Sequence, residues 1–505
     1  MTSPTNLSVA VRGVLRRAVD VFRDEPEIAK LLHQQLDRLD EPLRVAIAGK
    51  VKAGKSTLLN ALVGEDIAPT DAGECTRVVT WYQDGRTPKV VMYPRSGPPT
   101  SLPVHRRDGA LAIDLQGTAP EQLDRLVVDW PSQSLRTATL IDTPGIASAS
   151  TEIARRTWAF LAPEDDSLTE ADAVIYLMRH LHSADAQFLE SFQDQTVARA
   201  SSVNTIAVLS RADEVGGGRV DGMFSAKAIA RRYQAEPTLR SLCQTVIPVA
   251  GLLALTGRTL RQAEFAALKK LAHSPREHAD AMLLSVDHFL APDHSAGSSD
   301  SETPTSQNAL SREIRHSLLE RFGLFGIRLS TTLIRQGTDT PSGLAAELVR
   351  RSGMNELAEV LHTLFTQRSD LLKARSALRA LEHVLSSSTN AATKDLGGDV
   401  ERILGGAHEL TELRLLSAMR SDEVDLPRAE HAEAERLLGG SGVAPAVRLS
   451  LSADANPAQL QQAALEALGR WQRHAENPLF SRVAAEACRA VVRSCEGMLT
   501  NLPRE

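Results

Sequence analysis

The sequence feature that most constrains this chain is a phosphate-binding loop near its N-terminus. Residues 49–56 read Gly-Lys-Val-Lys-Ala-Gly-Lys-Ser and fit the pattern G-x-x-x-x-G-K-[ST]. An alternating apolar run at 43–48 precedes the pattern and an apolar helical stretch at 55–63 follows it, which is the context that such a loop requires. Glycines let backbone N–H groups close around a phosphate at a helix N-terminus. We therefore expect a nucleoside triphosphate site here, the alternative being an ordinary glycine-rich turn.

The residues of this loop have separate expected tasks. Lys55 would contact the β- and γ-phosphates, and the Ser56 hydroxyl would ligate Mg²⁺. The residues of this segment expected to contact the nucleotide are Gly49, Ala53, Gly54, Lys55, Ser56 and Thr57.

A second element follows the apolar run at 138–141, where residues 142–145 read Asp-Thr-Pro-Gly. Asp142 would hold Mg²⁺ through a water molecule, and the Gly145 N–H would sense the γ-phosphate. The position of this segment at the end of a predicted strand makes it a strong partner for the phosphate loop.

A switch threonine is expected between these two elements. Thr76 lies in a loop rich in Gly, Asp and Thr at 69–76. There its hydroxyl can complete the Mg²⁺ shell only when the γ-phosphate is present. Thr70 is the competing candidate, and a turn threonine without a metal role is the other alternative. The expected metal ligands are Ser56, Thr76 and, through water, Asp142.

The base-reading element is expected at residues 210–213, Ser-Arg-Ala-Asp, directly after an apolar run. It is similar to the guanine signature [NT]-K-x-D, but Ser210 and Arg211 depart from it; the arginine keeps an aliphatic stem that can lie along the purine. Asp213 would accept hydrogen bonds from guanine N1–H and N2–H₂, which adenine does not offer, so guanine is favoured over adenine. Ala250, also placed after an apolar run, is expected in the last base-contacting loop.

The order of elements predicts an α/β domain flanked by helices. Short β-branched runs alternate with helical stretches over 41–291, which is typical of a mainly parallel sheet covered on both faces. Residues 1–40 and 310–505 have helical periodicity, and their apolar stripes need a partner. We therefore expect both chain ends to form an elongated all-α neck or trunk bundle beside the P-loop GTPase domain. The segment 292–309 is rich in Ser, Asp and Pro and is expected to be a linker or a disordered loop.

Composition excludes several classes of protein. The 505 residues carry 57 Lys+Arg and 63 Asp+Glu, a net charge of −6, so a globally basic nucleic-acid binder is not expected. The polar N-terminus does not fit a signal peptide, and no apolar run approaches the roughly 20 residues of a membrane span. The four cysteines form no CxxC pair, as in reduced cytosolic proteins. A cytoplasmic protein, soluble or peripheral to a membrane, is the expectation.

The chain resembles the dynamin-like GTPases of bacteria and, more narrowly, the isoniazid-inducible mycobacterial Ini group. The resemblance rests on GKVKAGKS, ECTRVVTWY, IDTPG and SRADEVGGGR, and on the stretches PVAGLLALTGRTLRQAEF and RFGLFGIRLS. It implies a GTPase domain on a neck and trunk of helices, with GTP or GDP and Mg²⁺ as ligands. It also implies a homodimer or oligomer through the GTPase face, hetero-assembly with a related dynamin-like protein as an option, and peripheral contact with membrane lipid at the inner face of the cell membrane. Pairing would then drive tethering, fission or fusion.

The residues suggest hydrolysis by an in-line water, with charge neutralised by Mg²⁺, Lys55 and backbone N–H groups. Ile146 stands where Ras-like enzymes have the glutamine that orients this water. The resemblance places Lys52 near the α- and β-phosphates, and our hypothesis is that it supplies part of the charge of an arginine finger; a solvated lysine is the alternative. The expected catalytic set is Lys52, Lys55, Ser56, Thr76 and Gly145.

Two other functions stay open at this point. One is a GTP-regulated switch or assembly protein whose helices bind protein partners without membrane contact. The other is a P-loop ATPase or kinase that carries the Asp-Thr-Pro-Gly segment. Competition between GDP and ADP separates the last of these from the GTPase.

Overall fold

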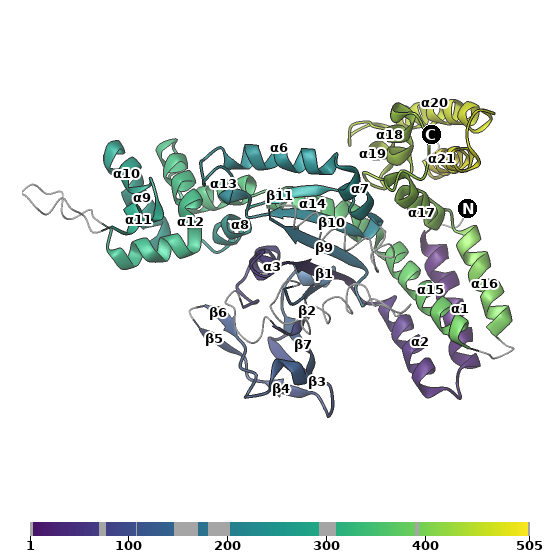
Figure 1. The fold of residues 1–505 in the computed structure, drawn as a ribbon, viewed down its shortest axis with the longest axis horizontal. Helices are drawn as coiled ribbons and strands as arrows, with labels where there is room; N and C mark the ends of the chain where they lie inside the picture. Colours follow the sequence, from purple (N-terminus) through teal and green to yellow (C-terminus); the bar gives the residue numbers. More distant parts are fainter. Residues whose placement is uncertain are drawn as a thin grey trace, which may run out of the picture.

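A large sheet lies at the centre of the structure, with helices packed around it and extending from it (Figure 1). The structure is a computed structural model that describes residues 4–69, 77–107, 109–145, 170–179, 202–291, 310–388 and 393–502. In this described part the sheet has nine strands in the order β11-β10-β9-β1-β8-β2-β7-β3-β4. Their bounds are β1 Leu43–Gly49, β2 Val79–Asp84, β3 Lys89–Pro94, β4 Thr100–Leu102, β7 Leu123–Trp130, β8 Ala138–Asp142, β9 Ala173–Met178, β10 Thr205–Ser210 and β11 Val246–Val249.

The predicted α/β fold with a mainly parallel sheet is confirmed. Strands β11, β10, β9, β1 and β8 pair with one another in parallel, and β2 is also parallel to β7. The other part of the sheet departs from the prediction, because β2 pairs antiparallel with β8, and β3 pairs antiparallel with both β7 and β4. The chain between β3 and β4 is too short for a helical crossover, so only a hairpin can join them. A separate ribbon pairs β5 (His105–Arg107) with β6 (Ala110–Ala112).

Alternation along β1 places its side chains in different cores on the two faces of the sheet. Val45 and Ile47 belong to one core, and Ala46 and Ala48 belong to the other. Helix α3 (Lys55–Val63) packs against β1 and β8, α6 (Gly222–Gln234) packs against β11, and α8 (Gly251–Arg258) packs on α3, while α7 (Pro237–Leu242) follows α6. Helices α9 (Gln262–His273), α10 (Arg276–Met282) and α11 (Val286–Leu290) lie to one side of the sheet, where they pack with one another and with the long helix that begins at Arg312 (Figure 1). The sheet therefore has a hydrophobic core on each face, with small residues of β1 in one core and larger ones in the other.

The helices that follow residue 310 divide by packing into two groups. The first group comprises α12 (Arg312–Arg335), α13 (Pro341–Arg351) and α14 (Met354–Leu364), and it lies against the sheet and α8. At the contact between α8 and α13, a Cβ on Gly257 would lie 2.9 Å from Val349. Gly353 has a φ of +80° and leaves no room for a Cβ beside the carbonyl of Pro248. This group therefore extends the α/β unit rather than the trunk.

Two glycines in α12 have different tasks. Gly323 has a φ of 60° and a ψ of 171°, which interrupts the helix with a kink. Gly326 has helical geometry, but a Cβ there would meet Leu253 at 3.4 Å. The first glycine thus bends α12, and the second allows α12 to pack closely on α8.

The second group forms a helical trunk with the N-terminal helices. Helices α1 (Pro4–Val21) and α2 (Pro26–Arg38) share a hydrophobic core with α15 (Ser369–Ser387) and α16 (Thr393–Gly406). Another core around the fully buried Trp471 joins α17 (His408–Arg420), α18 (Arg428–Leu437), α20 (Pro457–Ala475) and α21 (Arg482–Asn501), with α19 (Pro445–Arg448) beside them. Figure 1 shows both chain ends at this side of the molecule. The expectation of a helical trunk formed by both chain ends is therefore correct.

Asp172, directly before β9, joins the sheet to the trunk. Its Oδ1 accepts from Arg38 Nη2 at 2.8 Å and from Ser376 Oγ at 3.0 Å, and its Oδ2 accepts from the backbone N–H of Arg44 at 3.0 Å. Lys373 of α15 also donates to the carbonyl of Leu39 at 2.9 Å. One buried carboxylate thus connects α2, β1 and α15.

In the trunk, the buried Glu412 accepts a paired hydrogen bond from Arg448 at 2.7 and 3.0 Å, and a hydrogen bond from Ser494 at 2.7 Å. Burial alone would raise the pKa of Glu412, but the charge of Arg448 and hydrogen bonds from His408 and Arg448 lower it to about 2. Because the folded-state pKa is depressed, the stabilisation is complete above pH ~4.5 and is lost as the pH falls towards about 2.

We therefore expect acidification from pH 7 to pH 3 to lower the free energy of unfolding, with about 2 kcal/mol of the loss assigned to Glu412, out of about 3 kcal/mol when both its folded and unfolded carboxyl groups are protonated. The Glu412→Gln variant should be less stable at pH 7 by about 3–5 kcal/mol, since Arg448 loses its buried partner, and its stability should depend less on pH. Urea unfolding at both pH values measures this. The control is Glu486→Gln, which removes an exposed ion pair with Arg414. An equal pH dependence in the wild type and Glu412→Gln would contradict the assignment.

No helix among the residues described is both long enough and apolar enough to span a bilayer. Several predictions fall outside the described residues: the linker at 292–309 and the residues Thr70, Thr76 and Ile146.

Candidate nucleotide-binding site

The loop between β1 and α3 has the backbone geometry of a phosphate cradle. Gly49 has a φ of +147°, and a Cβ there would lie 2.5 Å from the carbonyl oxygen of Leu177 in β9. Gly54 is left-handed, with a φ of 93°, and directly precedes the first turn of α3. Lys52 is a non-glycine residue with a φ of 60°, and it is exposed. Glycine is needed at residue 49 because a side chain would clash with Leu177, and at residue 54 because the backbone is left-handed. The N-terminus of α3 directly follows this loop, where its N–H groups can bind a phosphate.

Lys55 lies at the centre of this loop. Its Nζ donates to the carbonyl oxygens of Gly49 and Lys50, both at 3.2 Å. Burial lowers the pKa of Lys55, and the nearby charge of Asp142 acts in the opposite direction. The ammonium group is thus held inside the loop, where a phosphate oxygen would be a stronger partner than a carbonyl.

Ser56 and Asp142, which belong to separate motifs, meet beside the loop. Ser56 Oγ donates to Asp142 Oδ2 at 2.9 Å. Asp142 Oδ1 is buried and has no hydrogen-bond partner among the described residues. Burial raises the pKa of Asp142, although Lys55 and Ser56 oppose this. A buried carboxylate oxygen without a donor, next to a serine hydroxyl, fits the oxygen ligands and waters that Mg²⁺ prefers.

The segment after β8 is fixed against the phosphate loop. Thr143 Oγ1 donates to the carbonyl of Ile47 at 2.9 Å. A Cβ on Gly145 would lie 2.5 Å from Val51 Cγ2 and 2.8 Å from Val51 Cα. Any side chain at this position would therefore push the two segments apart, and glycine keeps the backbone of residue 145 beside the phosphate loop.

A cavity of about 170 Å³ adjoins the loop on the side of β10. Asp213 lines it, and burial raises the pKa of that carboxyl group. Arg211 also lines it, in a left-handed conformation, with Nη1 donating to Glu214 Oε1 at 2.6 Å. The remaining lining residues are Ala53, Gly54, Thr57, Leu58, Leu177, Val208, Ser210, Glu214, Val249, Gly251 and Leu252. The phosphate loop and the predicted base-reading segment thus share one cavity.

Two base-site residues lie differently from the prediction. Ser210 lines the cavity, but its hydroxyl donates to the carbonyl of Met178 at 3.0 Å and so joins β10 to β9. Ala250 is fully buried and does not line the cavity, and its N–H donates to the carbonyl of Ser352 at 2.9 Å. The helices after residue 310 supply that acceptor, so the sequence near residue 250 carries no signal of it. Gly251 and Leu252 take the place on the cavity wall that Ala250 was expected to have.

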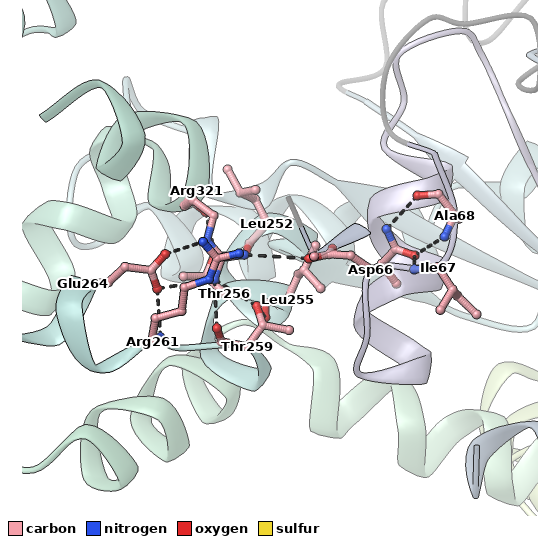
Figure 2. Close-up of polar contacts among 12 residues, drawn as sticks. Asp66, Ile67, Ala68, Leu252, Leu255, Thr256, Thr259, Arg261, Glu264 and Arg321 are labelled. Carbon is pink, nitrogen blue, oxygen red and sulfur yellow. Dashed lines mark hydrogen bonds and ion pairs between the residues drawn. The ribbon is translucent and has the colours of Figure 1, made fainter. Parts of the chain in front are cut away.

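Sequence reasoning also missed the polar cluster that holds the chain leaving α3 (Figure 2). The fully buried Asn60 accepts from the N–H groups of Ile67 and Ala68 at 3.0 and 2.7 Å, and it donates to the carbonyl of Ala68 at 2.9 Å. Asp66 lies 3.9 Å from Arg321 of α12, which is paired with Glu264 at 2.8 Å. An asparagine in an apolar helix is the one sequence signal that could have indicated this role. This cluster fixes the chain just before the segment 70–76.

The part of the chain that the structure describes contains no group of three or more His, Cys, Asp or Glu side chains suited to a metal. The Ser56–Asp142 pair, with its buried carboxylate oxygen that has no donor among the described residues, is the set of oxygen atoms that fits Mg²⁺.

Comparison with known proteins gives four similarities. Residues 45–212 match the Dynamin family. The isoniazid-induced protein IniC of Mycobacterium tuberculosis is 43% identical over 495 residues, which cover 97% of each chain. A bacterial dynamin-like protein of Nostoc punctiforme is 32% identical over 114 residues, 20% of this chain and 16% of that protein. A solved structure, described as an oligomerised bacterial dynamin pair that senses and tethers membranes, covers 98% of this chain and 73% of its own, with 14% identity and a TM-score of 0.31.

Proposed function

As the chain belongs to the bacterial dynamin-like GTPases, in the family of the mycobacterial protein IniC, we propose that it couples Mg²⁺-dependent GTP hydrolysis to self-assembly and membrane remodelling. The observation that carries this proposal is the convergence of Lys55, Ser56 and Asp142 beside a cavity lined by Asp213. The first three residues suit a Mg²⁺-bound triphosphate, and the fourth suits guanine.

We assign each residue one part of the reaction. The α3 N-terminus and the loop N–H groups bind the phosphates, and Lys55 stabilises negative charge that develops on the β- and γ-phosphate oxygens. Ser56 and Asp142 would hold Mg²⁺, which neutralises phosphate charge when bound. Gly145 places its N–H near the γ-phosphate, and Thr76 remains the proposed switch ligand. The remaining phosphate contacts are assigned to Gly49, Ala53, Gly54 and Thr57. Arg211 is assigned a contact with the base.

Lys52 is the proposed source of additional positive charge. It is exposed in the phosphate loop, and no ion-pair partner of Lys52 occurs within the described ranges. Its left-handed backbone is a strained state for a lysine, consistent with a functional position. The side chain is thus available to a phosphate or to a second molecule that docks on this face.

We expect Lys52→Ala to lower the single-turnover rate of GTP hydrolysis by at least about tenfold, because part of an arginine-finger effect would be lost. GDP affinity should change much less, since this charge acts mainly in the transition state. Lys52→Arg serves as the control and should retain most of the rate. An unchanged hydrolysis rate in Lys52→Ala would contradict this hypothesis and indicate that Lys52 is a solvated lysine without a catalytic role.

For the partners we propose a homodimer or oligomer through the GTPase face, a peripheral place at the inner face of the cell membrane, and assembly with a related dynamin-like protein. The support for this proposal is the membership of the chain in the bacterial dynamin-like family. For the domains, we propose a GTPase unit that starts at residue 41 and takes in α12–α14, and a trunk built from residues 1–40 and the helices from α15 onward.

Liposome co-sedimentation distinguishes membrane remodelling from a switch that acts only on protein partners. The full chain is mixed with anionic liposomes in the presence of GDP or a non-hydrolysable GTP analogue. Membrane remodelling predicts greater sedimentation with the analogue, because assembly multiplies weak lipid contacts. The absence of lipid binding in both nucleotide states would favour the switch protein.

A further inference from the structure

The loop that follows Asp213 contains three consecutive glycines in an unusual conformation. Gly216, Gly217 and Gly218 have φ values of 68°, 72° and 70°, all left-handed. Other residues reach such a run only at a cost of roughly 1–2 kcal/mol each, so glycine is required here. Glycine also gives the loop a large conformational entropy, and a defined loop structure therefore needs an external restraint.

Arg328 of α12 supplies that restraint. Its Nη1 donates to the carbonyl oxygens of Gly217 at 3.2 Å and Gly218 at 2.7 Å. Its Nε and Nη2 donate to the carbonyl of Leu283 at 2.9 and 2.6 Å, and Nη2 also donates to that of Leu284 at 3.0 Å. The planar guanidinium group thus binds the glycine loop to the turn between α10 and α11. A lysine ammonium could not span these four carbonyls.

The restrained loop lies directly against the backbone of Asp213. A Cβ on Gly218 would lie 3.7 Å from the carbonyl oxygen of Asp213 and 3.8 Å from Phe325, which is also on α12. The N–H of Gly217 donates to the carbonyl of Glu214 at 3.2 Å. The contact therefore runs from the Arg328 guanidinium through two glycine peptides to the short helical turn that carries the Asp213 carboxylate.

We propose that Arg328 is a positioning residue that determines base specificity: it holds the Asp213 carboxylate in place for guanine before the nucleotide binds. This inference rests on the proposed binding of guanine by Asp213. Preorganisation of this kind removes the ordering cost that a free glycine loop would impose on binding. It also connects α12, the helix that Gly323 kinks, to base recognition.

The test compares GDP with inosine diphosphate, whose base lacks the 2-amino group. A misplaced Asp213 carboxylate loses two hydrogen bonds to guanine but only one to hypoxanthine. We expect Arg328→Gln to weaken GDP binding about tenfold and inosine diphosphate binding about threefold, as measured by isothermal titration of the full chain. Gly217→Ala should act in the same direction, because the methyl group meets open space and only the left-handed backbone is strained. Arg328→Lys should not restore discrimination.

The matched control is Arg335→Gln. This change removes the same charge from the same helix, where Arg335 donates to the carbonyl of Ala272 and lies 3.5 Å from Asp280. It should leave both affinities unchanged, and circular dichroism melts check that each variant is folded. Equal weakening of the two nucleotides by Arg328→Gln, or an equal effect of Arg335→Gln, would overturn the positioning role. A wild-type chain that binds neither nucleotide would instead overturn the proposed function.

Discussion

Replacing Lys55 by alanine should lower the single-turnover rate of GTP hydrolysis by about a thousandfold or more. The Lys55 ammonium is buried within the phosphate loop and held by the carbonyls of Gly49 and Lys50. Preorganised charge of this kind stabilises the transition state without reorganisation, and its removal typically costs 10²–10³-fold or more. The measurement is release of γ-phosphate from an enzyme–GTP complex in excess enzyme with Mg²⁺.

The control for this change is Lys89→Ala, which removes an exposed lysine at the start of β3, in the antiparallel part of the sheet. Its hydrolysis rate should equal that of the wild type. A Lys55→Ala protein that is folded and hydrolyses GTP within about tenfold of the wild-type rate would contradict the assignment of residues 49–56 as the catalytic phosphate loop.

Replacing Asp213 by asparagine should weaken GDP binding by about a hundredfold and improve the binding of xanthosine diphosphate. The carboxylate can accept from guanine N1–H and N2–H₂, and each hydrogen bond to a charged group contributes about 1.5–3 kcal/mol. Xanthine has a carbonyl oxygen in place of the 2-amino group, and an asparagine amide can donate to it. Isothermal titration with both nucleotides measures the change in specificity.

Glu214→Gln is the matched control, because it removes the neighbouring carboxylate, which is more exposed and paired with Arg211. It should leave the preference for GDP over xanthosine diphosphate unchanged. If Asp213→Asn bound GDP as tightly as the wild type, guanine would not be recognised by Asp213. Equal losses for both nucleotides would show that residue 213 supports the loop without reading the base.

Local motifs predicted the phosphate side of the site because their residues are neighbours in sequence or lie at the ends of adjacent parallel strands. Lys55 is held by the loop that contains it, and β8 pairs with β1 so that Asp142 reaches Ser56. The parallel half of the sheet follows from the same short-range patterns of apolar strands and covering helices.

The remaining features depend on partners that are distant in sequence. The N–H of Ala250 donates to the carbonyl of Ser352, and Arg328 donates to the carbonyls of the glycine loop. In both cases the two partners are more than 100 residues apart in the sequence. An arginine in an amphipathic helix gives no sign of which carbonyls it will meet. The packing of α12 and α13 on α8 likewise depends on close contacts, such as that of Gly257 with Val349, which helical periodicity does not encode.

The measurement that tests the central claim most directly is nucleotide competition for the wild-type chain in the presence of Mg²⁺. A fluorescent GDP derivative is bound to the protein and displaced by unlabelled GDP or ADP. Guanine recognition by Asp213 predicts that GDP displaces the probe at a concentration at least about 100-fold lower than ADP. Displacement by ADP at the same or a lower concentration, or no binding of the probe at all, would contradict it.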